Sequence, residues 1–242
     1  MPKIPEWLKL PFQEAVDYQA QKIALPAETI DRLAAEYHDF AFVVSGLARA
    51  DLASDMQWLV ERVIADGMSL EDFKQQFDRL IGRKGWQPTG DKNRRLYTIL
   101  DTNVRRSQAA GKIEQARSPE MLSRRPYWMW QWRDSVQPRP HHQALNGKVF
   151  LASHSFWDVA TPPCGYGCKC GFFALSDRDL ERMGKHVEEP PDPYTIADPG
   201  FQRAPGINPV ADREDILKEG LSRQSPQIRK LATAELQKQG VL

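Results

Sequence analysis

Apolar residues recur every three or four positions through most of the first 116 residues of the chain, which is the spacing of one face of an α-helix. The spacing predicts amphipathic helices over four segments, residues 11–24, 52–65, 69–81 and 91–116. Residues 28–49 carry the same spacing, but Gly46 interrupts it, so one helix and two shorter helices are equal alternatives there. The amino-terminal half is therefore expected to be helical.

The pattern changes after residue 126, where prolines, glycines and aromatic residues replace the helix formers. Three short apolar and aromatic runs are expected to be strands, at residues 127–132, 148–151 and 170–175. Ser176 is placed to cap a short helix over residues 177–183, and Gly184 is placed to end it. Two polar helices are expected near the carboxyl end, over residues 212–221 and 226–239.

These elements predict an α+β protein, in which a helical amino-terminal half precedes a small, aromatic-rich carboxy-terminal half of mixed α+β structure with long loops. We expect three regions, a helical region at residues 1–120, an α+β core at 121–210 and short helices at 211–242. A chain of 242 residues is long enough to bury a core as one large domain or two small ones.

Composition narrows the class of protein. The net charge is +1 with 27% charged residues, so no overall electrostatic field marks a nucleic-acid or membrane binder. The longest apolar run, residues 40–44, is far shorter than the roughly 20 residues that a membrane helix needs. All three cysteines fall in one loop, which is unlike the disulfide framework of a small secreted domain. We expect a cytoplasmic protein with no membrane partner.

The stretch between residues 133 and 176 concentrates the reactive side chains, since it holds all three cysteines and three of the five histidines. Cys168 and Cys170 are too close in sequence for an unstrained disulfide, which leaves several alternatives open. They are free buried thiols, ligands of a zinc ion, or part of a Cys–His pair for nucleophilic catalysis. In the zinc alternative a histidine is the third ligand, and the fourth comes from one of three residues, Cys164, His154 or Asp158. An RNase-like role for Arg139 and His142 is a further alternative.

The other face of the helix expected over residues 91–116 is basic, with the cations Lys92, Arg94, Arg95, Arg105, Arg106, Lys112 and Arg117 along it or just beyond. One interpretation is a solvated surface. The other is a surface for DNA or an acidic partner protein, in which four arginines make the DNA contacts, Arg94, Arg95, Arg105 and Arg106. Asn103 lies on the apolar side of the same helix, where its amide needs a hydrogen-bond partner.

Short motifs follow one another in order along about residues 11–210. From Arg139 to Gly147 the chain reads Arg-Pro-His-His-Gln-Ala-Leu-Asn-Gly, followed by Phe156-Trp157, Pro162-Pro163 and Cys168-Lys169-Cys170. Upstream stand Phe40-Ala41-Phe42 and Thr102-Asn103 with Gly111, and downstream stand Asp198-Pro199-Gly200-Phe201 and Pro205-Gly206. Together these motifs resemble the phage head morphogenesis family, the Mu F-like minor head proteins of tailed phages and prophages.

The resemblance assigns expected roles to individual residues. His142, rather than His141, matches the family histidine, and Cys168 and Cys170 match the paired family cysteines, so these three are the expected ligands of a zinc ion. Cys164 stands where the family usually has a polar residue other than cysteine, and it is the fourth candidate ligand. The motif residues expected to have structural roles are Arg139, Asn103, Trp157 and Gly147.

The resemblance also implies a function. It predicts a minor capsid or head morphogenesis protein of a phage or prophage, without enzymatic activity, that acts at the portal vertex in procapsid assembly and in DNA packaging or delivery. The implied partners are the portal protein, the major capsid or scaffold proteins, and DNA. The implied location is the host cytoplasm during assembly and then the virion head. Two alternatives remain: a metal-dependent or Cys/His nuclease or protease-like enzyme of packaging, and a DNA-binding packaging accessory.

Overall fold

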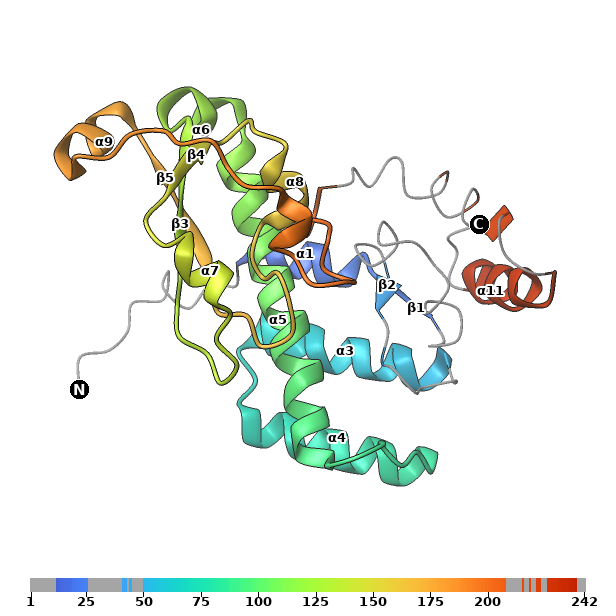
Figure 1. Cartoon of the computed structure of the whole chain (residues 1–242). Coiled ribbons are helices and arrows are strands. Elements are labelled where there is room, and N and C mark those ends of the chain that lie inside the picture. The colour runs from blue at the N-terminus through green and yellow to red at the C-terminus, as the bar shows by residue number, and fades with distance from the viewer. Residues whose placement is uncertain are drawn as a thin grey trace.

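The fold is seen in a computed structural model that describes residues 12–25, 41–42, 44, 50–207, 215, 218, 221–222 and 226–238. The chain has the α+β fold predicted from its sequence, with helices first and a small sheet later (Figure 1). None of the helices in the described ranges combines the length and the hydropathy that crossing a bilayer requires.

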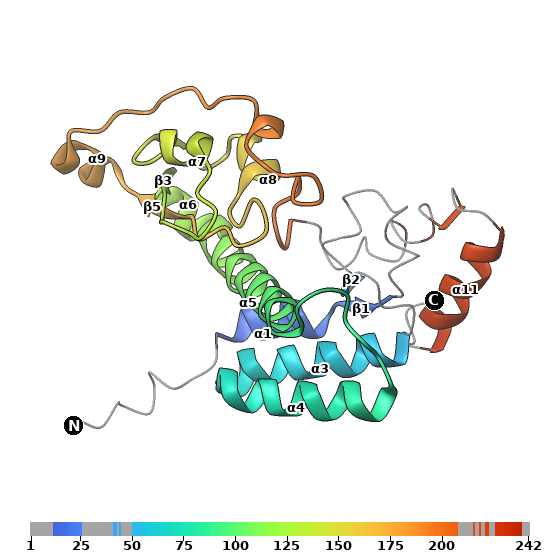
Figure 2. The same cartoon turned by 60° about the horizontal axis from the view of Figure 1, so that its bottom comes forward.

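Four helices form most of the amino-terminal half: α1 (Gln13–Ala20), α3 (Ala50–Asp66), α4 (Leu70–Lys84) and α5 (Lys92–Arg117). The three longer helices match the predicted segments to within a few residues. Figure 2 shows α1, α3 and α4 below one end of α5, while the other end of α5 reaches the carboxy-terminal half. The longest helix therefore belongs to both halves of the molecule.

The first helix is shorter than predicted because the chain enters a strand. Residues Ile23–Ala24 form β1, which pairs in parallel with β2, Ala41–Phe42. A continuous helix over residues 28–49 is therefore wrong at Ala41 and Phe42, and most of that segment lies outside the described residues. The buried side chain of Phe42 packs into the apolar core of the helices. An apolar residue is therefore expected at this position whether the segment is a helix or a strand.

Local capping fixes the boundaries of α4 and the start of α5. The Ser69 hydroxyl accepts a hydrogen bond from the backbone N–H of Asp72 at the start of α4, and Gly85 ends that helix with φ of 69°. The Asp91 carboxylate accepts from the N–H of Arg94 at the start of α5. Each bond satisfies an N–H group that a helix leaves unpaired.

A close approach between α1 and α5 depends on Gly111. A Cβ atom at this buried position would lie 2.8 Å from Cζ of Phe12 and 2.9 Å from the backbone nitrogen of Ala15. Polar residues seal the same contact, since the Ser107 hydroxyl donates to Oε1 of Gln19 over 3.0 Å. Asn103 finds its partner within α5, because its Nδ2 donates to the carbonyl of Ile99 over 2.8 Å.

The carboxy-terminal half is built on an antiparallel sheet in the order β4 (Val149–Leu151), β3 (Tyr127–Gln131), β5 (Gly171–Leu175). All three strands were predicted. The short helices around them, α6 (Pro119–Arg124), α7 (Pro140–Ala144) and α8 (Phe156–Ala160), were not.

The predicted helix α9 (Asp177–Met183) has a complete capping box at Ser176 and ends at Gly184 with φ of 60°. The 3-10 turn η3 (Pro193–Thr195) and helix α11 (Pro226–Lys238) follow; most of the helix predicted over residues 212–221 lies outside the described residues.

The core of this half is aromatic. Alternate residues of β3 point to one face, so Trp128 and Trp130 are both fully buried while their neighbours are half-buried. Trp128 stacks on Phe172 of β5 at 4.2 Å between ring centroids, and its other neighbour is Trp157 of α8 at 5.3 Å. The Trp157 indole N–H also donates to the carbonyl of Leu151 over 3.1 Å, which ties α8 to the sheet. Trp157 therefore lies at the centre of this core.

Candidate metal centre

A histidine from α7 and two cysteines from the loop before β5 meet beside this aromatic core. Arg139 has extended backbone angles, and Pro140 then starts the single helical turn that turns His142 inward. The imidazole of His142 is 2% exposed and lies edge-on to Trp130 at 5.7 Å between ring centroids. Cys168 is also 2% exposed, and Cys170 is half-buried. We call these three residues the Cys–His cluster.

The spacing of the ligand atoms suits a metal ion. Nδ1 of His142 lies 3.7 Å from Sγ of Cys168 and 3.8 Å from Sγ of Cys170, and all three atoms lie within 4.8 Å of one another. In a tetrahedral zinc site, Zn–S bonds of about 2.3 Å and Zn–N bonds of about 2.0–2.1 Å separate sulfur from nitrogen by about 3.6 Å. The cluster therefore needs only small shifts to hold zinc.

The orientation of His142 favours metal binding as well. Its Nε2 lies 2.9 Å from the carbonyl oxygen of Ile196. Since a carbonyl only accepts hydrogen bonds, Nε2 carries the hydrogen and the lone pair is on Nδ1, which faces both sulfur atoms. Metal-binding histidines commonly donate their second N–H to a carbonyl or carboxylate in this way, because the bond fixes the tautomer and the ring orientation.

The two cysteines of the cluster differ in protonation. A hydrogen bond from the Cys170 thiol lowers the pKa of Cys168 to about 4. The same bond to Cys168 raises the pKa of Cys170, and burial raises it further. Without a metal the pair therefore shares one negative charge, whereas a bound zinc ion would take both sulfurs as thiolates.

The residues considered as a fourth ligand have other partners. The Cys164 thiol donates to the carbonyl of Ala160 over 3.2 Å, and burial raises its pKa well above the ordinary value. Nδ1 of His154 accepts from the backbone N–H of Phe156 over 3.0 Å. Asp158 pairs with Arg117 at 2.6 Å. Over the described part of the chain, the group with metal-ligand spacing consists of His142, Cys168 and Cys170.

An ion pair holds the cysteine loop in place. Nε and Nη2 of Arg139 both donate to the carboxylate of Asp198, and Nη2 also donates to the carbonyl of Tyr166 over 3.3 Å. The pair packs directly on Gly165, where any side chain would overlap both the carboxylate and the guanidinium. The backbone N–H of Asp198 donates to the carbonyl of Cys164 over 2.9 Å, so the loop is bound on two sides.

Arg139→Lys is expected to lower the free energy of unfolding by about 1–3 kcal/mol, because an ammonium group cannot reproduce the two parallel bonds of the guanidinium fork at this partly buried pair. Chemical denaturation of the purified variants measures the loss. In a double-mutant cycle with Asp198→Asn, a coupling energy of about 1 kcal/mol or more supports the clamp, and strictly additive effects would contradict it.

Asp198 and the Ile196 carbonyl were not predicted as parts of this site. The Asp198-Pro199-Gly200-Phe201 motif was visible in the sequence, but nothing in it indicates that its carboxylate meets an arginine 59 residues upstream. Gly147, by contrast, acts locally. It has φ of 76°, and its N–H donates to the carbonyl of Trp130 over 2.9 Å.

The four predicted DNA-contact residues all lie on α5, but their surroundings differ. Arg94 is exposed and Arg95 is half-buried. Arg105 pairs at 2.8 Å with Asp101, which lies one turn earlier in the helix. Arg106 is 5% exposed, so the expectation that it belongs to a solvated basic face is wrong.

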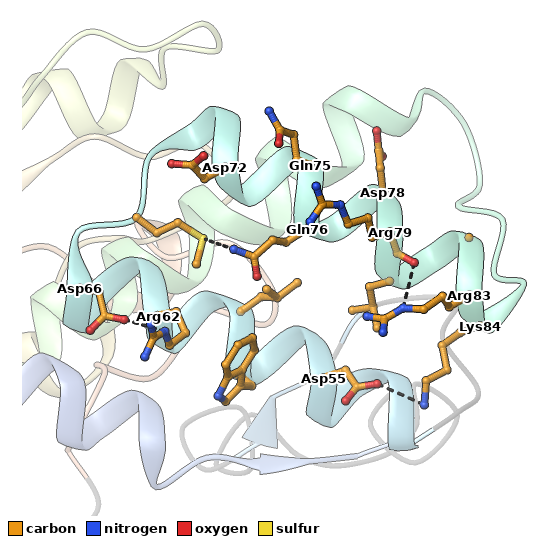
Figure 3. A pocket seen from close by; sticks show the side chains of 15 residues that line it. Asp55, Arg62, Asp66, Asp72, Gln75, Gln76, Asp78, Arg79, Arg83 and Lys84 are labelled. Atoms are coloured by element: carbon orange, nitrogen blue, oxygen red, sulfur yellow. Dashed lines mark hydrogen bonds and ion pairs between the residues drawn. The ribbon is translucent and has the colours of Figure 1, made fainter.

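A groove with a volume of about 1210 Å³ lies between α3 and α4 (Figure 3). Many of its charged side chains pair with each other, as Arg62 does with Asp66 at 2.6 Å and Lys84 with Asp55 at 3.2 Å. None of the residues predicted as functional lines it. Its size alone therefore does not make it the functional site.

Comparison with known proteins points to one group. Residues 54–173 match the family model described as "Phage Mu protein F like protein". The matched region contains all three residues of the Cys–His cluster together with Arg139 and Trp157. No solved structure matches the chain.

Two curated proteins match over longer stretches. The "Mu-like prophage FluMu F protein" of Haemophilus influenzae is 29% identical over 160 residues, which is 62% of this chain and 38% of that protein. The "Putative capsid assembly protein F" of Escherichia phage Mu is 29% identical over 194 residues, or 74% of this chain and 44% of that protein. The chain thus spans about two fifths of the length of these relatives.

Proposed function

Because the chain belongs, through residues 54–173, to the Phage Mu protein F like family, we propose that it takes part in building the head of a phage or prophage. It acts by binding other head proteins at the portal vertex during procapsid assembly. The portal protein and the major capsid or scaffold proteins are its partners, in the host cytoplasm and then in the virion head. The observation that carries the proposal is the similarity to a protein whose name describes capsid assembly.

Zinc is the proposed cofactor, and its role is structural. His142, Cys168 and Cys170 would hold it. The ion would join α7 to the loop that precedes β5, two segments that the sheet alone does not connect. The burial of Cys168 and His142 supports a structural role, because a reactive thiol is usually accessible to its substrate.

Deleting the gene for this chain from its phage or prophage is expected to reduce the number of filled, infectious heads sharply, because assembly proteins act before the head is complete. Electron microscopy of lysates and the titre of infectious particles measure this. A plasmid copy that carries Cys168→Ser should restore fewer heads than one that carries Cys164→Ser, since only Cys168 belongs to the Cys–His cluster. Normal numbers of filled, infectious heads in the deletion strain would exclude the proposal.

An enzyme of DNA packaging is the second candidate function, and one observation favours it. Three protein ligands leave one position of a tetrahedral zinc ion for water or substrate, as in catalytic zinc sites. Incubation of the zinc-loaded protein with plasmid DNA separates the two functions. Under the assembly proposal the DNA stays intact. Cleavage by the wild-type protein that is lost in Cys168→Ser would instead support the enzyme and overturn the assembly proposal.

A further inference from the structure

A second groove, separate from the Cys–His cluster, runs along α5 and has a volume of about 530 Å³. One wall is α5 itself, and the opposite wall includes Tyr166, Gly200 and Phe201 from the two loops that the Arg139–Asp198 pair joins. Lys22, Val44 and Gln137 complete its lining. We call it the α5 groove.

The residues that α5 contributes form two rows. Arg94, Thr98, Thr102 and Arg106 follow one another at intervals of four, and the second row consists of Arg95, Ile99 and Asn103. Residues four apart are neighbours on a helix surface, so each row is continuous. Twelve residues rise by about 18 Å, which separates the backbone positions of Arg94 and Arg106 by that length along the helix axis. The α5 groove is therefore long and has a guanidinium-bearing residue at each end.

Arg106 is an unusual residue for an interior position. Its side chain is 5% exposed, yet Nε and Nη1 have no hydrogen-bond partner. Its other contacts are weak. Nη2 donates a long hydrogen bond of 3.5 Å to the carbonyl of Arg203, and the guanidinium carbon lies 5.6 Å from the ring centre of Phe201. A buried charge with unsatisfied donors costs free energy unless an anion or a set of acceptors compensates it.

The charge of the α5 groove has one sign. Its lining includes Lys22, Arg94, Arg95 and Arg106, and no aspartate or glutamate among the residues that the structure describes. Arg94 is exposed. Arg105, which adjoins Arg106 in sequence, is outside the groove and is already paired with Asp101. Among the cations that line the groove, Arg106 is thus the residue with buried donors that lack a partner, whereas its neighbour in sequence is paired.

We propose that the α5 groove binds the sugar–phosphate backbone of a nucleic-acid strand, with Arg94 and Arg106 contacting different phosphates. The length of the groove exceeds what one phosphate can bridge, which favours a chain of phosphates over a single anion. Arginine, lysine, threonine, asparagine, glutamine and tyrosine, the polar residue types of its lining, are those that bond to phosphates and sugars in nucleic-acid complexes. Tyr166, 60% exposed, adds an aromatic ring on which a base can stack.

Fluorescence anisotropy of a labelled oligothymidylate, titrated with the full chain at several salt concentrations, tests this proposal. We expect affinity to fall steeply as salt rises, because bound phosphates release counterions. Arg94→Gln should weaken binding several-fold and reduce the slope of log affinity against log salt by about 0.7, the value for one phosphate contact on a single strand.

Arg124→Gln is the matched control. It removes the same charge from α6, where Arg124 pairs with Glu120 on the exposed surface, so it should leave both the affinity and the slope unchanged. Equal losses of affinity in the two variants would mean that net charge alone explains the effect, and would overturn the proposal. So would the absence of any binding to the oligonucleotide. Binding of polyglutamate instead, with the same dependence on Arg94, would assign the groove to an acidic protein segment and also overturn it.

Arg106→Met separates binding from folding. Removal of an uncompensated buried charge should leave the melting temperature of the free protein the same or higher, while the affinity for the oligonucleotide falls several-fold. Wild-type affinity in a folded Arg106→Met protein would contradict the proposal. If Arg106→Met fails to fold, the Arg94→Gln and Arg124→Gln comparison decides by itself. The outcome does not depend on head assembly, because binding is measured on the isolated chain.

Discussion

Removal of zinc by a chelator is expected to lower the free energy of unfolding by about 4 kcal/mol when zinc had been present at about a thousand times its dissociation constant. For a chain of this size that loss corresponds to a fall of about 8–16 °C in melting temperature. The physical reason is that zinc would bind the folded arrangement of His142, Cys168 and Cys170, which the unfolded chain does not hold together. Calorimetry with and without chelator measures the change.

Cysteine variants supply the controls for this experiment. Cys168→Ser should melt like chelated wild-type protein and should no longer respond to chelator. Cys164→Ser should keep the full response, because Cys164 is bonded to the Ala160 carbonyl outside the Cys–His cluster. If chelator left the melting temperature of the wild-type protein unchanged, zinc would not be part of the folded state.

Trp157→Ala is expected to lower the free energy of unfolding by about 3–5 kcal/mol, because a fully buried tryptophan leaves a cavity that its neighbours fill only in part. The ring lies 5.2 Å from Phe156, 5.3 Å from Trp128 and 5.8 Å from Phe150, so three other aromatic side chains lose contacts together. The substitution also removes the donor to the Leu151 carbonyl. Urea denaturation followed by circular dichroism measures the loss.

Trp58→Ala is the comparison for this variant, since Trp58 is 53% exposed on α3 and its removal should change stability by about 0.5 kcal/mol or less. The same residue type is thus tested in both environments. Similar losses in the two variants would contradict the view that the aromatic cluster around Trp157 is the core of the carboxy-terminal half.

Elements with strong local signals could be predicted from the sequence. Helices α4 and α9 begin at serines whose side chains cap them, and the run of aromatic residues over Tyr127–Gln131 predicted its strand. The missed helices α7 and α8 have five residues each, too few for a periodic pattern. Strand β2 was missed because its two residues are stabilised by pairing with β1, a contact that no local pattern reports.

The candidate site shows the same division between local and distant effects. His142, Cys168 and Cys170 could be chosen from residue type and motif, and the structure places them together. The tautomer of His142 could not be predicted, because it depends on the Ile196 carbonyl, 54 residues further along the chain. Arg106 was expected on a solvated face because helical spacing gives direction around an axis but does not reveal that the loop containing Phe201 covers that position.

Elemental analysis of the purified full chain is the most direct test of the proposed metal centre. We predict one zinc ion per chain in the wild-type protein and in Cys164→Ser, and no stoichiometric zinc in Cys168→Ser or in a variant that lacks the His142 imidazole. Wild-type protein that contains no stoichiometric zinc after purification without chelator, and takes up none when zinc is added, would contradict the account.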